Sequence, residues 1–220
     1  MLRTLFSNYA YECHGVVLPN GRSATRYAPG TKQPLILAAG RLWDCAKNLT
    51  ALEEVAPQLP WPVLVAGSNS QPGGGVRHLR GVRALGDLAP ERLAREFARA
   101  AIYALPARYE PFGLSVLEAA LAGCALVLGD VPSLREVWGS TALYVPPDDH
   151  AALRASLSRL ISDDRLRERL AGASRRRALT YTPERMGQAY LAAYSGMLKG
   201  ARAARAPACS LSAEFHTCVS

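Results

Sequence analysis

Short apolar runs, each bounded by glycine, proline or polar residues, alternate with longer amphipathic stretches over most of the chain. The apolar runs predict six strands, at residues 35–39, 63–66, 81–85, 101–105, 125–128 and 142–145. The stretches between them predict helices at residues 48–59, broken at Pro57, and at residues 90–99, 114–122 and 132–138. Strands that alternate with helices in this way indicate an α/β fold, a Rossmann-like parallel sheet with flanking helices. The loops after Ala39, Ala66, Leu105 and Leu128 should then converge on one crevice, where such sheets bind ligands.

The two ends of the chain follow other patterns. After the last strand, helices are expected at residues 148–161, 163–179 and 183–198, the last with Thr182 as its cap and Pro183 at its first position. Residues 199–220 are small, polar and aperiodic, which predicts a flexible tail. Near the N-terminus, residues 16–18 are expected to form a short strand, followed by a turn at residues 19–22.

Residues 105–123 carry the clearest sign of a binding site. Pro106 ends a buried strand, Pro111 and Gly113 mark a loop, and a helix follows directly. The free amides of a helix N-terminus favour a bound anion, and here they belong to Gly113, Leu114, Ser115 and Val116. Glu110 and Glu118 flank these amides, and carboxylates accept hydrogen bonds from sugar hydroxyls. Together these groups suit a nucleotide sugar.

A second polar element follows the first predicted strand. It begins at Gly40, whose lack of a side chain lets the backbone approach a ligand closely, and it ends at Asn48. Arg41 can bridge phosphate oxygens with its planar fork, and Lys47 adds a mobile positive charge. The pair is suited to the negative charge that a diphosphate leaving group develops.

Both elements resemble motifs of one enzyme family. Glu110-Pro-Phe-Gly-Leu-Ser-Val-Leu-Glu118 resembles the E-x7-E motif of the GT-B retaining glycosyltransferases of family 4 (glycosyl transferases group 1). Residues 40–48 resemble the Gly-Arg … Lys-Asn element of the same family. The resemblance implies that Glu110 contacts the donor sugar, that Glu118 contacts the ribose, and that Arg41 and Lys47 contact the diphosphate. The implied catalytic set is Glu110, Arg41 and Lys47. The implied donor-binding set is Gly40, Arg41, Lys47, Leu85, Glu110, Phe112, Gly113, Leu114, Ser115, Val116 and Glu118.

Within that set, Leu85 is expected to lie against the base, and Gly67 with the loop after it is a weaker candidate for shaping the base pocket. The resemblance further implies sugar transfer from a nucleotide-diphosphate sugar to an acceptor with retention of configuration, without a protein nucleophile, a metal or a cofactor. A nucleotide-sugar-binding module without transferase activity of its own is the alternative. A nicotinamide-dependent enzyme is disfavoured, because no G-x-G-x-x-G follows a strand and residues 73–75 do not fit that fingerprint.

The resemblance covers residues 16 to about 198 but only half of a GT-B fold. Residues 1–33 would be a remnant of the N-terminal domain with its linker, and residues 34–182 the nucleotide-sugar-binding domain. Residues 183–198 would form the C-terminal helix, which in the family reaches back to the N-terminal domain, and residues 199–220 the tail. The expected partners are therefore a nucleotide sugar, an unknown acceptor, and a missing N-terminal domain or partner subunit.

Composition bears on the size of the core, on membrane segments and on the expected cellular location. Hydrophobic residues make up 49% of the 220 residues, enough for one sizeable core, and no run of about 18 apolar residues predicts a transmembrane helix. The N-terminal residues lack the apolar stretch of a signal peptide. Five scattered cysteines and four isolated histidines indicate neither a disulfide framework nor a metal site, and a cytoplasmic location is the simplest expectation.

The net charge of +8 is concentrated in the C-terminal helices. Residues 1–150 hold 14 Lys and Arg against 13 Asp and Glu, whereas residues 151–205 hold 12 against 4. Two interpretations stay open, namely solvated helix faces and a surface that meets anionic lipid at the inner membrane face or an anionic acceptor. Nucleic acid is not an expected partner, since no recognition module accompanies the charge.

Overall fold

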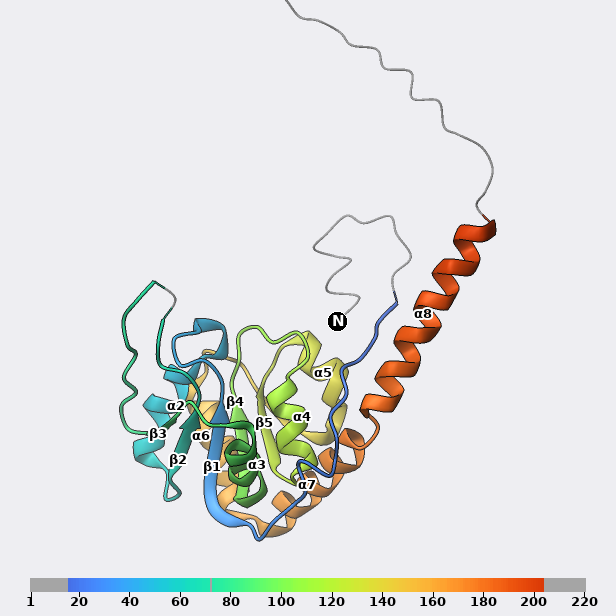
Figure 1. Cartoon of the computed structure of the whole chain (residues 1–220). Helices are drawn as coiled ribbons and strands as arrows, with labels where there is room; N and C mark the ends of the chain where they lie inside the picture. The colour runs from blue at the N-terminus through green and yellow to red at the C-terminus, as the bar shows by residue number, and fades with distance from the viewer. Residues whose placement is uncertain (1–15, 72, 204–220) are drawn as a thin grey trace, which may run out of the picture.

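One parallel sheet organises the protein. The computed structural model describes residues 16–71 and 73–203, with the backbone alone for residues 199–203 (Figure 1). Within these residues, six strands pair in the order β3-β2-β1-β4-β5-β6, and all pairs are parallel. The strands are β1 (Gln33–Ala39), β2 (Val63–Ala66), β3 (Arg83–Gly86), β4 (Ala100–Leu105), β5 (Ala125–Gly129) and β6 (Leu143–Val145). The predicted Rossmann-like parallel sheet is confirmed.

Alternate side chains of each strand enter two separate cores, one on each face of the sheet. In β1, Leu35 and Leu37 enter the first core, while Ile36 enters the second, because successive side chains of a strand point to opposite faces. The first core lies against α3 (Pro90–Arg99), α4 (Leu114–Leu121) and α5 (Pro132–Trp138). The second lies against α2 (Leu49–Val55) and α6 (His150–Ser162), and α7 (Asp164–Ala178) contributes to both. The central strands β4 and β5 are buried throughout, which explains their unbroken apolar sequences.

Local signals set the helix ends. The carboxylate of Asp149 accepts from the amide of Ala152 at the start of α6, and that of Asp163 accepts from the amide of Leu166 at the start of α7. The predicted helix at residues 48–59 is α2 followed by a 3-10 turn, η2 (Ala56–Gln58), because Pro57 cannot continue the α-helical hydrogen bonds. Two further 3-10 turns are η1 (Cys45–Lys47) and η3 (Gly139–Thr141).

The main corrections to the predicted elements concern three segments. Residues 16–18 form no strand, and they pair with none of the six strands of the described sheet. β3 begins at Arg83 rather than residue 81, because Gly81 adopts φ +69°. α8 (Pro183–Ala203) continues past Leu198, so the first five residues of the predicted tail are helical. The rest of that tail, and residues 1–15, lie outside the described residues.

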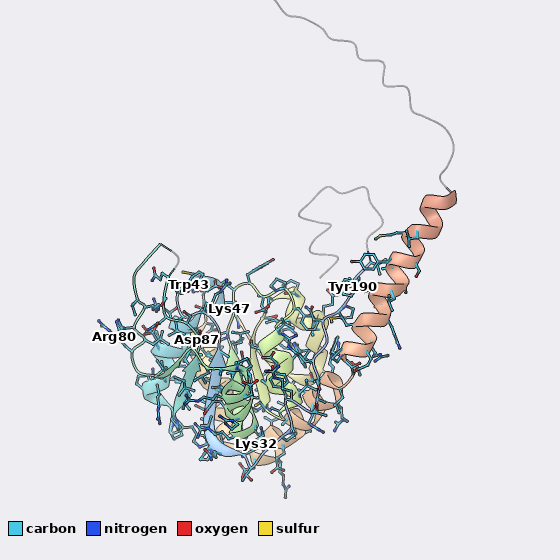
Figure 2. The ribbon with its side chains drawn as sticks, viewed as in Figure 1. Lys32, Trp43, Lys47, Arg80, Asp87 and Tyr190 are labelled. Atoms are coloured by element: carbon cyan, nitrogen blue, oxygen red, sulfur yellow. The ribbon has the colours of Figure 1, made fainter. Side chains whose placement is uncertain are left out.

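α8 projects from the sheet domain, and the segment before β1 runs beside its first turn (Figure 1). The amide of Arg22 donates to the carbonyl of Tyr181 at 3.0 Å, and a Cβ on Gly21 would lie 2.3 Å from the carbonyl oxygen of Thr182. Residues 21–22 are therefore fixed against the turn between α7 and α8. Figure 2 shows Trp43 and Lys47 on loops at the carboxyl end of the sheet, Lys32 at the opposite end, and Tyr190 on the projecting helix.

Candidate donor-binding site

A cavity of about 620 Å³ opens at the carboxyl ends of β1, β2 and β4. It is walled by the loops that follow these strands and β3, by the N-terminal parts of α3 and α4, and by the segment before β1. Its lining residues are Asn20, Ala39, Gly40, Arg41, Lys47, Ala66, Gly67, Ser68, Asp87, Leu88, Leu93, Glu110, Pro111, Phe112, Gly113, Leu114, Ser115 and Glu118. The predicted convergence of loops is confirmed for those after β1, β2 and β4, whereas the loop after β5 does not line the cavity.

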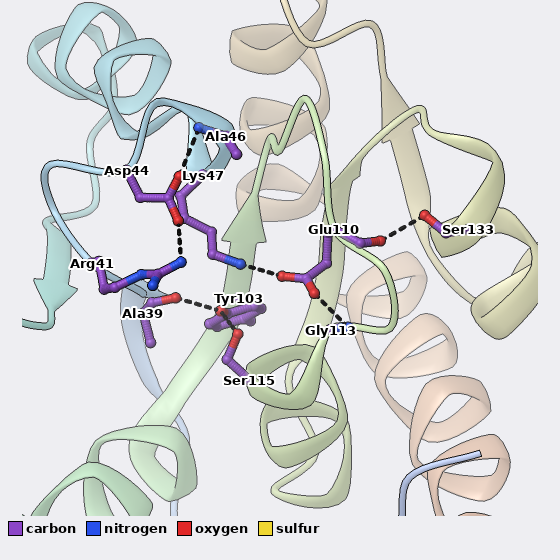
Figure 3. A network of polar contacts seen from close by, with 10 residues as sticks. All are labelled: Ala39, Arg41, Asp44, Ala46, Lys47, Tyr103, Glu110, Gly113, Ser115 and Ser133. Carbon is purple, nitrogen blue, oxygen red and sulfur yellow. Dashed lines mark hydrogen bonds and ion pairs between the residues drawn. The ribbon is translucent and has the colours of Figure 1, made fainter. Parts of the chain in front are cut away.

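Glu110 is held tightly by its own loop (Figure 3). Its Oε1 accepts from the amide of Gly113 at 2.9 Å, and its backbone carbonyl accepts from Ser133 Oγ at 2.6 Å. Gly113 adopts φ +83°, and a Cβ there would lie 2.9 Å from Val116 Cγ2, so the turn into α4 requires glycine. The amide of Gly113 therefore already has an acceptor. The first-turn amides that remain for an anion are those of Leu114, Ser115 and Val116.

Lys47 joins the two predicted motifs. Its Nζ donates to Glu110 Oε2 at 2.5 Å (Figure 3), and the two side chains are only 19% and 10% exposed. The neighbouring Asn48, buried with φ 55°, donates from Nδ2 to the carbonyls of Pro106 at 2.9 Å and Pro147 at 2.7 Å. Asn48 thus ties together the loops after β1, β4 and β6 and places Lys47 opposite Glu110.

Arg41 lies at the rim of the cavity. Its Nη2 donates to Asp44 Oδ2 at 2.6 Å, its guanidinium lies 4.9 Å from the Trp43 ring centroid, and its side chain is 60% exposed. The other carboxylate oxygen of Asp44 accepts from the amide of Ala46 at 3.0 Å. Asp44 therefore holds Arg41 while capping η1, so both cations of the cavity wall have carboxylate partners.

Tyr103 forms a buried link beneath the cavity (Figure 3). Its hydroxyl lies 2.8 Å from Ser115 Oγ and donates to the carbonyl of Ala39 at 3.3 Å. Burial raises the pKa of Tyr103, which keeps the phenol neutral and able to donate. This link fixes the first turn of α4 to the end of β1.

Glu118 stands between the first cavity and a second one of about 640 Å³. Its Oε1 accepts from Arg22 Nε at 2.8 Å, and Tyr27 lies nearby in the wall of the second cavity. Burial, with the nearby charge of Glu118, raises the pKa of Tyr27 to about 12. The second cavity is lined by Gly21, Arg22, Ser23, Arg26, Tyr27, Leu88, Pro90, Leu93, Glu118, Pro183 and Met186.

Most of the predicted site residues line the first cavity. Two do not, because the side chain of Val116 is fully buried in the first core and Leu85 packs against that core. Beside Leu85, Asp87 and Leu88 line the cavity instead, as do Leu93 and Asn20. Sequence reasoning missed these four, and the turn glycine at residue 86 was the available signal that the loop after β3 reaches the site.

The described residues contain no group of three or more His, Cys, Asp and Glu side chains arranged to hold a metal ion. None of the described helices combines the length and the apolar character needed to span a bilayer.

The fold matches one class of proteins. The six-stranded arrangement is that of the Rossmann-like domains of GT-B glycosyltransferases. Residues 33–163 match the family described as glycosyl transferases group 1, and the chain belongs to this family.

The relatives are longer proteins. The chain is 32% identical over 180 residues to glycogen synthase of Mycobacterium tuberculosis, an alignment that covers 73% of this chain and 43% of the enzyme. Sucrose-phosphate synthase from Thermosynechococcus elongatus superposes with a TM-score of 0.78 at 21% identity, over 90% of this chain and 57% of that one. Anabaena HepE in complex with UDP-glucose superposes with a TM-score of 0.70 at 16% identity, over 80% and 56%. This chain thus spans about half the length of the relatives it matches.

Proposed function

We propose that the chain is the donor-binding, C-terminal half of a retaining GT-B glycosyltransferase that uses a nucleotide-diphosphate sugar. One observation carries the proposal. A single cavity brings together the carboxylates of Glu110 and Glu118, the ammonium of Lys47 and the first turn of α4. That cavity lies at the carboxyl ends of parallel strands, where such sheets bind ligands.

The proposed mode of binding follows from the positions of the donors and acceptors. The amides of residues 114–116 and the positive end of the α4 dipole take the diphosphate. Lys47 has three N–H donors, so it can keep its contact with Glu110 and also donate to a phosphate oxygen. Arg41, at the rim, joins the leaving diphosphate as negative charge develops on it.

The two glutamates take the hydroxyl groups on either side of the diphosphate. Glu110 uses its remaining lone pairs to accept from the donor sugar, and Glu118 accepts from the ribose. Glu110 is not assigned as a nucleophile, because Lys47 and the Gly113 amide both hold its carboxylate in the loop. In this proposal neither a metal nor a cofactor takes part.

A second domain, in the same polypeptide or in a partner subunit, would supply the acceptor site and close over the donor. Relatives such as the mycobacterial glycogen synthase have more than twice the aligned length. α8 carries an exposed apolar face that could pack against such a domain, formed by Tyr190, Leu191, Tyr194, Met197 and Leu198. The alternative function is nucleotide-sugar binding without transfer by this chain alone. It is favoured because the chain spans only about half the length of the relatives it matches.

We also propose, on fewer observations, that the basic C-terminal helices contact the inner membrane face from the cytoplasm. Arg167, Arg175 and Arg177 donate to backbone carbonyls at the ends of neighbouring elements, so these side chains serve the fold. The side chains of Arg165, Arg169 and Arg176 are exposed on α7 and remain for an anionic surface.

The proposal is tested with UDP-, GDP- and ADP-sugars, by measuring binding calorimetrically and release of the nucleoside diphosphate enzymatically. We expect one donor class to bind, with Glu118→Ala weakening it and the exposed-carboxylate control Glu91→Ala leaving it unchanged. Release of the diphosphate by the chain alone would exclude the binding-only alternative. A folded chain that binds none of the donors would contradict the proposal.

A further inference from the structure

The contact between Arg22 and Glu118 is not explained by a catalytic motif. Arg22 lies in the segment before β1, 96 residues from Glu118, and its side chain reaches the wall shared by the two cavities. The Glu118 side chain is only 11% exposed, whereas that of Arg22 is 36% exposed. A carboxylate this buried needs a partner of opposite charge or several hydrogen bonds to offset the loss of water.

The backbone around Arg22 is fixed independently of Glu118. Its amide donates to the carbonyl of Tyr181 at 3.0 Å, and Gly21 packs too closely on Thr182 to admit a side chain. Tyr181 in turn packs edge-on against Phe112, with ring centroids 5.6 Å apart, in the loop that carries Glu110. The backbone that carries the Arg22 side chain is therefore held by contacts other than the ion pair with Glu118.

Arg22 leaves room for a ligand on the same carboxylate. Two carboxylate oxygens offer about four lone-pair sites. Arg22 Nε occupies one on Oε1, and Glu118 lines the first cavity, so acceptor capacity remains for a ligand there. A vicinal diol, as in ribose, needs a carboxylate of fixed orientation to accept from both hydroxyls.

We propose that Arg22 is a positioning residue that orients the Glu118 carboxylate for the ribose diol of the bound nucleotide. This inference rests on the proposed function, because it takes the occupant of the first cavity to be a nucleotide. Arg22 acts through Glu118 and touches neither the phosphates nor the reacting atoms. Its removal should therefore affect discrimination between ribose and deoxyribose more than binding of the diphosphate.

The test compares three probes by calorimetry on the full chain: the best-binding nucleoside diphosphate, its 2′-deoxy analogue and inorganic pyrophosphate. In the unmodified chain, the 2′-deoxy analogue should bind roughly ten- to a hundredfold more weakly, the worth of one hydrogen bond to a charged group. Arg22→Ala should bring this ratio to within about threefold and leave pyrophosphate affinity unchanged. Arg22→Lys should restore part of the ratio, because a point charge attracts the carboxylate without the geometry of the fork.

Two further variants complete the design. Arg26→Ala removes a cation from the same segment whose partner, Glu91, is 69% exposed, and it should leave the ratio unchanged. In a Glu118→Ala background, adding Arg22→Ala should have no further effect on the ratio. Circular dichroism and urea unfolding of each variant would separate loss of the fold from loss of orientation.

The possible results distinguish failure of the proposed function from failure of the role proposed for Arg22. If the unmodified chain binds no nucleotide, the proposed function fails and this inference fails with it. If it binds the ribose and deoxyribose forms equally, Glu118 does not contact the ribose, and this inference is overturned while donor binding stands. If the unmodified chain discriminates and Arg22→Ala retains the full ratio, the inference alone is overturned. Equal losses for the nucleotide and for pyrophosphate would show that Arg22 contacts phosphate, which also overturns it.

Discussion

The contact between Lys47 and Glu110 allows a quantitative test of how the site is held. We consider Lys47→Met, which removes the ammonium but keeps most of the stem that packs against Gly40. Glu110 Oε2 then loses its partner at 2.5 Å and retains only the hydrogen bond from the Gly113 amide to Oε1. Breaking a buried ion pair costs about 3–5 kcal/mol, and an exposed one at most about 1 kcal/mol.

The position of this pair sets the expected value between those limits. The two side chains are 19% and 10% exposed, but they border an open cavity through which water reaches Glu110. We therefore expect Lys47→Met to lower the free energy of unfolding by about 2–3 kcal/mol, measured by urea denaturation. The matched control is Arg26→Met, which breaks an ion pair exposed by 47% and 69% and should cost less than about 1 kcal/mol.

A double-mutant cycle with Glu110→Gln isolates the pair. Since the neutral amide needs no cation, Lys47→Met should cost about 1–2 kcal/mol less in that background. Additive effects of the two substitutions, within about 0.5 kcal/mol, would refute the coupling that the geometry implies.

Three further predictions concern single residues. Gly113→Ala should destabilise the protein by about 2 kcal/mol in urea unfolding, because Gly113 has a left-handed φ and a Cβ there would approach Val116 too closely. An unchanged urea midpoint would mean that the turn relaxes freely. Asn48→Ala should cost about 2–4 kcal/mol, because it orphans the buried carbonyl of Pro106 and loses the bond to the half-buried carbonyl of Pro147. A loss below about 1 kcal/mol would show that water replaces the Asn48 amide. Arg41→Ala should weaken binding of the nucleoside diphosphate by about 1.5 kcal/mol, measured by calorimetry. This value is at the low end for a charge-assisted hydrogen bond, because Asp44 competes for the guanidinium. An unchanged dissociation constant would remove Arg41 from the site.

Much of the fold could be predicted from the sequence because its strands are buried on both faces. The central strands β4 and β5 have unbroken apolar sequences that only a parallel sheet between helices accommodates. Gly113 and Pro106 similarly marked the loop that carries Glu110. The failures lie where tertiary contacts decide, as at residues 16–18, which are apolar but pair with neither edge strand of the sheet, β3 or β6.

The motifs of the site could be predicted from the sequence, but the contacts between their side chains could not. Spacing along the chain identifies Lys47 and Glu110 separately, yet nothing local shows that one holds the other. The same is true of Arg22, which sequence placed in a turn and which the fold brings to Glu118 across 96 residues. Asp87 and Leu88 were missed because the loop after β3 carries no conspicuous chemistry and acquires its place only through the neighbouring strands.

The most direct test of the central claim is a crystal structure of the chain with the nucleoside diphosphate that binds best in calorimetry. We expect the diphosphate at the amides of residues 114–116 within reach of Lys47, and the ribose hydroxyls on Glu118. A nucleotide bound elsewhere, or one in the first cavity with its ribose away from Glu118, would contradict it.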